Sequence, residues 1–342
     1  MNSIGVDLHK KTISVCVMIQ EGRRRTIVAR QSLRCAHETA IAAWFAAWQP
    51  FEVVVEATAN YEWFLKLIEP TASRIVLAHP KKLRVIAEST RKTDKLDAQL
   101  LAEFLTLDMI PQAYRPTPRQ REYRQLVRHR YYLRRRITSV KNKLHHLAGH
   151  YNADLPGLFT QKGQEHLRRL PLSSSDRFIA EQLEAELKEH LGRRGQVDRQ
   201  LAHFAQKAAL VEREARAVLE SMPGMGAVTI DVLLSELGDV RRFRSQKHVM
   251  AYAGLVPGLR QSAERCRSLG ITKEGSRLLR WAMIQLAWRM INKTRRWGLI
   301  YQKLRARCGP KKAVVAVARR LLGVIVALLR SGQQYRLAAP CV

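Results

Sequence analysis

Acidic residues placed in strongly apolar segments constrain this chain more than any other feature. Asp7 lies within the apolar string IGVDLH, and Glu56 ends the aliphatic string VVVE. Burying a carboxylate without a partner is costly, so the fold must supply a partner for each of these acids. The pattern favours a fold in which both acids belong to one functional site.

A second pair of acids, Asp94 and Asp97, stands in the string KTDKLDA at the start of a predicted helix. Their spacing of three residues places them on one helical face, where their charges repel each other. Each acid alone could instead cap a helix or form an ion pair. A divalent cation would offset the repulsion, and oxygen ligands from two strands and a helix suit Mg²⁺. Two such ions can hold the attacking and the leaving oxygen of a phosphodiester.

Residues 1–115 are predicted to form an α/β domain. Strands are expected over 3–8, 12–19, 26–32, 52–56 and 74–77, with a helix over about 36–48. Three meandering strands followed by alternating helices and strands are typical of an RNase H-like domain. Other α/β folds share this order, and the acids are what favour the RNase H-like one.

Residues 116–220 are predicted to form a basic helical arm, beginning after Pro116 and Pro118. The helix expected over 119–143 carries ten Lys or Arg against the single acid Glu122, with apolar residues at three- and four-residue steps. A second helix is expected over about 176–220, which predicts an antiparallel hairpin or coiled coil. The arm could be a spacer or a dimerisation element, or its first helix could contact nucleic acid. The candidate contacts are Arg128, Arg134, Arg135, Arg136 and Lys141.

Residues 221–342 are predicted to be mainly helical. The string PGMG at 223–226 resembles a helix-hairpin-helix turn, in which Gly224 and Gly226 would let backbone N–H groups approach a phosphate; a plain helix-start turn is the alternative. Arg319 and Arg320 interrupt the apolar segment 313–329, and its longest uninterrupted run, 321–329, is too short to span a bilayer. The segment is predicted to close the domain core, with a basic membrane-surface helix as the alternative.

The net charge indicates a polyanionic partner. The chain of 342 residues has 60 Lys or Arg against 29 acids, a formal charge of +31. Such an imbalance favours DNA or RNA over a merely basic surface. Five scattered cysteines and the lack of a signal peptide predict a cytoplasmic protein with reduced thiols, without disulfides or a zinc ribbon.

Three strings carry a specific resemblance: IGVDLHKKTISV, VVVEATANYEWF and RKTDKLDAQLLAEFL. They resemble the DEDD motifs of the insertion sequence one-ten family of transposases. The resemblance implies a RuvC-like N-terminal domain, an RNase H relative. It also implies that Asp7, Glu56, Asp94 and Asp97 hold the metal.

A second set of strings resembles the family's C-terminal transposase domain: PGMG, ELGD, AYAGLVP and GITKEG. Between the last two, the family carries a nucleophilic serine, and this position falls on Ser262, with Ser268 as the nearest rival. The string reads QSA where the family has glycine after serine, and an ordinary loop serine is the alternative. Arg260, Arg265 and Lys273 would neutralise phosphates or form a solvated basic face.

The resemblance implies a prokaryotic, nucleoid-associated transposase or recombinase. It would cleave and rejoin DNA with Ser262, depend on Mg²⁺, with two ions expected and Mn²⁺ as the alternative, and use a noncoding bridge RNA. A homodimer or homotetramer is expected, with a composite site across protomers and no membrane partner. The rival predictions are a junction nuclease that uses water and leaves Ser262 idle, and a non-catalytic nucleic-acid scaffold.

Overall fold

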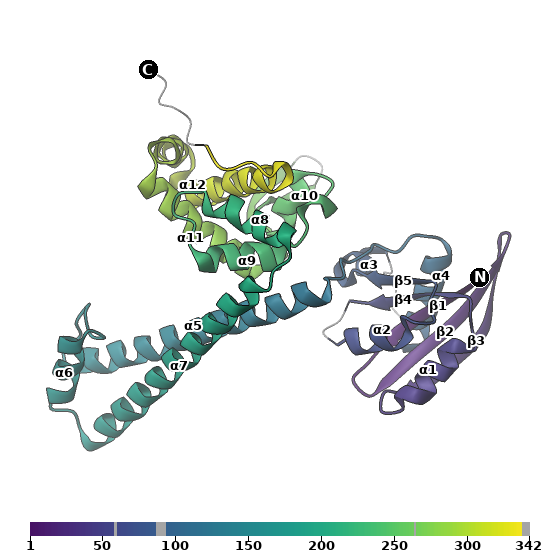
Figure 1. Cartoon of the computed structure of the whole chain (residues 1–342), viewed down its shortest axis with the longest axis horizontal. Helices are drawn as coiled ribbons and strands as arrows, with labels where there is room; N and C mark the ends of the chain where they lie inside the picture. Colours follow the sequence, from purple (N-terminus) through teal and green to yellow (C-terminus); the bar gives the residue numbers. More distant parts are fainter. Residues whose placement is uncertain (58–59, 87–93, 263–264, 337–342) are drawn as a thin grey trace. The chain divides into compact units, whose positions relative to one another are not determined.

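The computed structural model of the chain describes residues 1–57, 60–86, 94–262 and 265–336, without the side chains of 85–86, 94–96, 259–262 and 265–269. The chain divides into two compact units, Met1–Arg115 and Pro116–Val342 (Figure 1). The predicted division of the second unit into an arm and a terminal domain remains a prediction.

A five-stranded sheet organises the N-terminal unit. Its strands are β1 (Asn2–Leu8), β2 (Thr12–Glu21), β3 (Arg24–Arg34), β4 (Phe51–Glu56) and β5 (Arg74–Ala78), in the order β3-β2-β1-β4-β5. The first three strands form an antiparallel meander, and β4 and β5 run parallel to β1. All five strands lie where the sequence predicts them.

Helices cover both faces of this sheet, which explains the uninterrupted aliphatic run of β4. The helices are α1 (Glu38–Ala46), α2 (Glu62–Ile68), α3 (Pro80–Ile86) and α4 (Asp94–Thr106). Val53 and Val55 pack with α1 and α2 in one core, whereas Val54 packs on the opposite face with Leu101 and Leu105 of α4. The mixed α/β architecture predicted for this segment is confirmed.

An antiparallel helical hairpin begins the second unit. It comprises α5 (Pro118–His150), the short α6 (Gln161–Arg169) and α7 (Ser174–Gln206), as Figure 1 shows. Ile137, Val140 and Leu144 of α5 pack with Leu183 and Leu187 of α7. The apolar stripe predicted on the first helix is therefore what joins the pair.

The single helix predicted over 176–220 is wrong. The chain leaves the helical conformation after Gln206 and resumes as α8 (Leu210–Glu220). Lys207, Ala208 and Ala209 form the break, although alanine and lysine are good helix formers. The turn lets the end of α8 enter the C-terminal core through Leu219, and the neighbouring Val218 is also buried. Tertiary packing thus overrides local propensity here.

The rest of the second unit is mainly helical, as predicted. Its elements are α9 (Ala227–Leu237), the 3-10 turn η1 (Val240–Arg242), α10 (Gln246–Tyr252), β6 (Pro257–Ser262), β7 (Arg265–Ile271), α11 (Arg277–Lys293) and α12 (Arg295–Ser331). The antiparallel hairpin of β6 and β7 was not predicted from the sequence. Its last residue, Ile271, is partly buried and packs against the C-terminal core.

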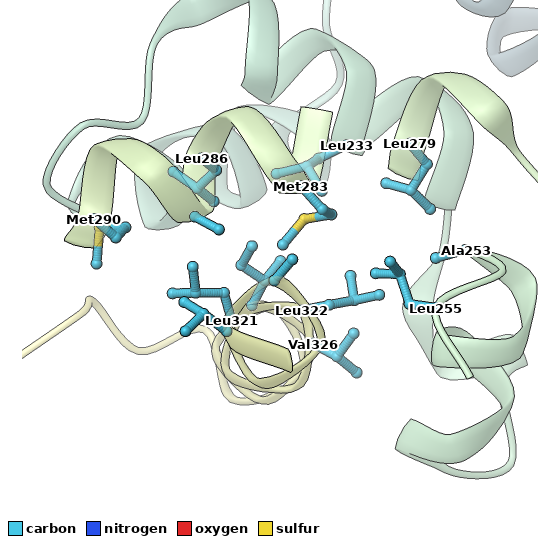
Figure 2. Close-up of a cluster of buried hydrophobic side chains, with 14 of the residues drawn as sticks. Leu233, Ala253, Leu255, Leu279, Met283, Leu286, Met290, Leu321, Leu322 and Val326 are labelled. Carbon is cyan, nitrogen blue, oxygen red and sulfur yellow. The ribbon is translucent and has the colours of Figure 1, made fainter. Parts of the chain in front are cut away.

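The C-terminal core lies between α9, α11 and α12. Met283 and Leu286 of α11 point toward Leu321 and Leu322 of α12 in Figure 2. The prediction that segment 313–329 closes the domain core is confirmed. Gly309 has a left-handed φ of 77° and is followed by Pro310, which kinks α12 ahead of this apolar part. Within the described residues, the helices lack an apolar stretch long enough to cross a bilayer.

Candidate active site

Three of the four predicted metal ligands line one pocket of the N-terminal unit. Asp7 of β1, Glu56 at the end of β4 and Asp97 of α4 surround a cavity of about 140 Å³, together with Arg84 of α3. The register of the two strands explains why Asp7 and Glu56 lie close together. Val6 pairs with Val55 in parallel register, so the acid that follows each valine lies at the same end of its strand.

The close approach of α4 to the sheet brings Asp97 to the pocket. A Cβ added at Gly5 of β1 would lie 2.0 Å from the carbonyl oxygen of Ala98, the residue after Asp97. Only glycine permits this contact, because any side chain would push the helix away from the strand. The glycine in IGVDLH therefore positions Asp97 on the helix above it.

His9 and Arg84 belong to the site, although the sequence pattern did not single them out. The side chain of Asp7 is 14% exposed, and its Oδ2 lies 3.0 Å from Nε2 of His9. The spacing of two residues could have indicated His9, since alternate residues of an extended strand share a face. Arg84 had no such signal, because its place depends on how α3 folds back over the end of the sheet.

The pocket offers the oxygen donors that a divalent cation prefers. Asp94 is the first residue of α4, but its side chain lies outside the described residues. In the described part of the chain, His, Cys, Asp and Glu side chains form no cluster of three or more that could hold a metal ion. The pocket thus brings three carboxylates together without drawing them to ligand distance.

Ser262, the candidate nucleophile, is the last residue of β6 and pairs in register with Arg265 of β7. It ends a strand, whereas the alternative of an ordinary loop serine would place it in a loop. The side chains of Arg260, Ser262 and Arg265 lie outside the described residues, as does Ala263. Lys273 is exposed and has a left-handed φ of 55°, between β7 and α11.

Close backbone contacts fix the base of this hairpin. A Cβ added at Gly254 would lie 2.2 Å from the carbonyl oxygen of Glu274, and one added at Gly275 would lie 2.1 Å from that of Tyr252. The Thr272 N–H donates to the carbonyl of Val256 at 3.0 Å. These contacts determine where the strand that carries Ser262 leaves the domain.

Two family models match the chain. A DEDD-type transposase model of the IS110 family matches residues 4–152, which include Asp7, Glu56, Asp94 and Asp97. The model described as "Transposase IS116/IS110/IS902 family" matches residues 216–302, which include Ser262. The chain belongs to the IS110/IS116/IS902 family of transposases.

Curated relatives agree with this assignment. The transposase for insertion sequence element IS1111A of Coxiella burnetii is 26% identical over 350 residues, covering 98% of this chain and 92% of the relative. The transposase for element IS1328 of Yersinia enterocolitica is 24% identical over 83% of this chain and 82% of its own length. A pilin gene-inverting protein of Moraxella bovis is 23% identical over 97% of both chains.

The predicted family is thus confirmed, and the chain is a DNA transposase of insertion-sequence type. DNA is accordingly its partner. A DEDD-type domain also suggests dependence on a divalent metal ion.

In this family member, several cations predicted to contact nucleic acid already have partners within the second unit. Arg128 donates to both carboxylate oxygens of Glu236, at 2.8 and 3.1 Å, which raises the pKa of Arg128. A phosphate contact by Arg128 would have to replace this ion pair. The other candidates are Arg134 over the Trp281 ring, Arg136 at 3.3 Å from Glu186, Lys141 over the Phe159 ring, and the exposed Arg135.

The PGMG string forms the turn between α8 and α9. Gly224 has a left-handed φ of 75°, which explains a glycine there, and Gly226 is the N-terminal cap of α9. Arg289 of α11 donates to the Gly224 carbonyl at 3.4 Å. Phosphate binding by this turn stays a prediction.

Proposed function

We propose that this IS110-family transposase cleaves and rejoins DNA through a covalent phosphoserine formed by Ser262, in a reaction that depends on Mg²⁺. The observation that carries the proposal is the single pocket lined by Asp7, Glu56 and Asp97. The sheet order β3-β2-β1-β4-β5, with an antiparallel meander followed by two parallel strands, supports an RNase H-like, RuvC-like domain.

The proposed metal ligands are Asp7, Glu56, Asp94 and Asp97. Four carboxylates gathered in one pocket would repel each other, and two divalent cations would neutralise them. Mn²⁺ accepts the same oxygen ligands, so the donor set by itself does not select Mg²⁺. When bound, such ions stabilise the charge that develops on the attacking and leaving oxygens.

The proposed cleavage and rejoining need no reactant other than the DNA and the protein. The Ser262 Oγ forms a bond to phosphorus while the bond to one strand oxygen breaks. That oxygen takes up the proton that the Ser262 hydroxyl loses, and it leaves as a hydroxyl. Attack by a hydroxyl of another strand on the phosphoserine then rejoins the DNA and regenerates serine, so the energy of the broken bond is conserved. Ser262 needs activation, because a free serine hydroxyl is a weak nucleophile.

The rest of the assembly belongs to the same proposal. The partners are the DNA ends of the element, its target and a noncoding bridge RNA. The helical hairpin would join protomers into a dimer or tetramer, with acids and serine contributed by different protomers. The basic residues exposed on α5, Arg135 among them, support contact with a polyanion.

A denaturing gel tests the chemistry. The full-length protein is incubated with Mg²⁺, candidate RNA and labelled element-end DNA. We expect a protein–DNA adduct from the unaltered protein and from Ser268→Ala, and none from Ser262→Ala or Asp97→Asn. Ser268 is the matched control because it lies on the same hairpin.

Two results would contradict the proposal. Strand cleavage by Ser262→Ala without an adduct would indicate a nuclease that uses water. Full activity of Asp97→Asn would show that the pocket acids do not take part in the reaction.

A further inference from the structure

The positive charge is concentrated in the second unit. Residues 1–115 contain 16 Lys or Arg and 12 acids, whereas residues 116–342 contain 44 and 17. The last acid of the chain is Glu274, and the 68 residues after it hold fifteen Lys or Arg and no Asp or Glu. The positive charges of this segment therefore cannot be neutralised by Asp or Glu side chains of the same segment.

The basic helix α5 presents a different case, because the fold supplies it with acids. Carboxylates from α7, α8 and α9 neutralise arginines along its length. The ion pairs are Arg119–Glu212, Arg128–Glu236, Arg130–Asp198 and Arg136–Glu186. These four arginines of α5, which by sequence would be candidates for contact with nucleic acid, are thus paired with acids of the protein itself.

Five cations around the kink of α12 have no such ion pair among the residues that the structure describes. They are Lys303, Arg305, Arg307, Lys311 and Lys312, which we call the kink cluster. All five are exposed, and among the residues the structure describes none reaches a carboxylate. Lys303 and Arg307 are four residues apart on the same face of the helix, where like charges repel. An external polyanion would offset this repulsion.

A membrane surface fits this cluster poorly. An amphipathic helix that lies on a bilayer needs a free apolar face beside its cations. The apolar residues that follow the kink, including Val317, Leu321 and Ile325, are fully buried in the C-terminal core. A helix over 313–329 therefore has no free apolar face with which to lie on a membrane surface.

We propose that the kink cluster binds the phosphodiester backbone of duplex DNA. The family assignment makes DNA the polyanion that this protein must hold. Flexible lysine and arginine side chains on a helix surface contact phosphates and carry no base readout by themselves. The cluster therefore strengthens binding to any sequence and leaves the choice of target to other parts of the complex.

Salt-dependent binding tests this proposal apart from the chemistry. The full-length protein is titrated with a short DNA duplex of arbitrary sequence, in EDTA, between about 50 and 200 mM salt. The test variant changes all five cluster residues to Gln. The control variant changes five other exposed cations of the second unit to Gln: Lys162, Arg168, Lys188, Lys207 and Arg213.

Each phosphate contact contributes about 0.9 to the slope of log K against log salt. We expect the cluster variant to lose about 4 from this slope and to bind at least roughly tenfold more weakly at the higher salt. The control variant should change much less. Circular dichroism and the thermal midpoint verify folding, and single changes such as Lys303→Gln, each worth about 1 in slope, replace a variant that fails to fold.

Equal losses in the cluster and control variants would overturn the proposal, as would an unchanged slope. A parallel titration with duplex RNA separates the two polyanions. Loss of RNA binding with DNA binding intact would also overturn it. Because no cleavage is measured, failure of the serine mechanism leaves this result unaffected.

Discussion

Gly254 and Gly275 lie in segments that pack against each other at the base of the β6–β7 hairpin. Both have left-handed backbone angles, with φ of 65° and 92°. A side chain at either position would collide with a backbone carbonyl, and at Gly254 it would also collide with the guanidinium of Arg280. These glycines are therefore required by packing as well as by conformation, and they hold the strand that ends at Ser262.

Gly275→Ala should lower the free energy of unfolding by about 3–4 kcal/mol, because it combines a left-handed φ with a backbone collision. Gly332→Ala is the control. Gly332 also has a positive φ, of 69°, but an added Cβ would meet nothing within 4 Å. Its cost should be about 1 kcal/mol. Urea denaturation measures both, and equal losses would show that the packing contact is unimportant.

At the scale of elements, α5 is fastened to α9 by buried polar contacts as well as by apolar packing. Glu236 of α9 has a side chain only 1% exposed and accepts two hydrogen bonds from Arg128. Arg124 of α5 donates to the backbone carbonyls of Ser235 and Glu236, each at 2.8 Å. The two helices are thereby held in one register.

Arg128→Met should destabilise the protein by about 2–3 kcal/mol, because the buried carboxylate of Glu236 loses both donors. Arg136→Met, on the same helix, should cost less than about 1 kcal/mol, since its partner Glu186 is partly exposed. Adding Glu236→Met to Arg128→Met should recover most of the loss. Chemical denaturation of the four proteins checks this, and a double variant no more stable than Arg128→Met would contradict it.

For the whole molecule, the charge imbalance should make the two units respond differently to salt. The excess of Lys and Arg over acids is 27 in residues 116–342 and 4 in residues 1–115, from the 44 against 17 and 16 against 12 residues of each kind. Like charges within a compact unit repel, and salt screens this repulsion over about 10 Å at 0.1 M.

Raising the salt concentration should therefore slow amide hydrogen exchange in helices of the second unit, α12 above all, and change β1 and β4 little. Mass spectrometry of peptides from both units measures the difference. The N-terminal unit serves as the internal control within the same sample. Equal slowing in both units would mean that salt acts through some general effect, independent of local charge.

The sequence predicted the sheet and most of the candidate site because the signals there are local. A carboxylate inside IGVDLH or after VVV is anomalous by itself, so Asp7 and Glu56 could be found without a structure. Arg84 could not, because only the path of α3 brings it to the pocket. The break between α7 and α8 was missed for the same reason: burial of Val218 and Leu219, rather than any Gly or Pro, requires it.

The amino-acid sequence by itself determined the five strands of the N-terminal sheet, the family and the candidate acids and serine, since periodicity and motif strings are properties of neighbouring residues. Only the tertiary structure decided which positive charges are available. Arg128 and Lys303 look alike in the sequence, yet one donates to a buried Glu236 and the other faces solvent. Ion pairing depends on acids that come from distant segments, and their positions are known only once the chain has folded.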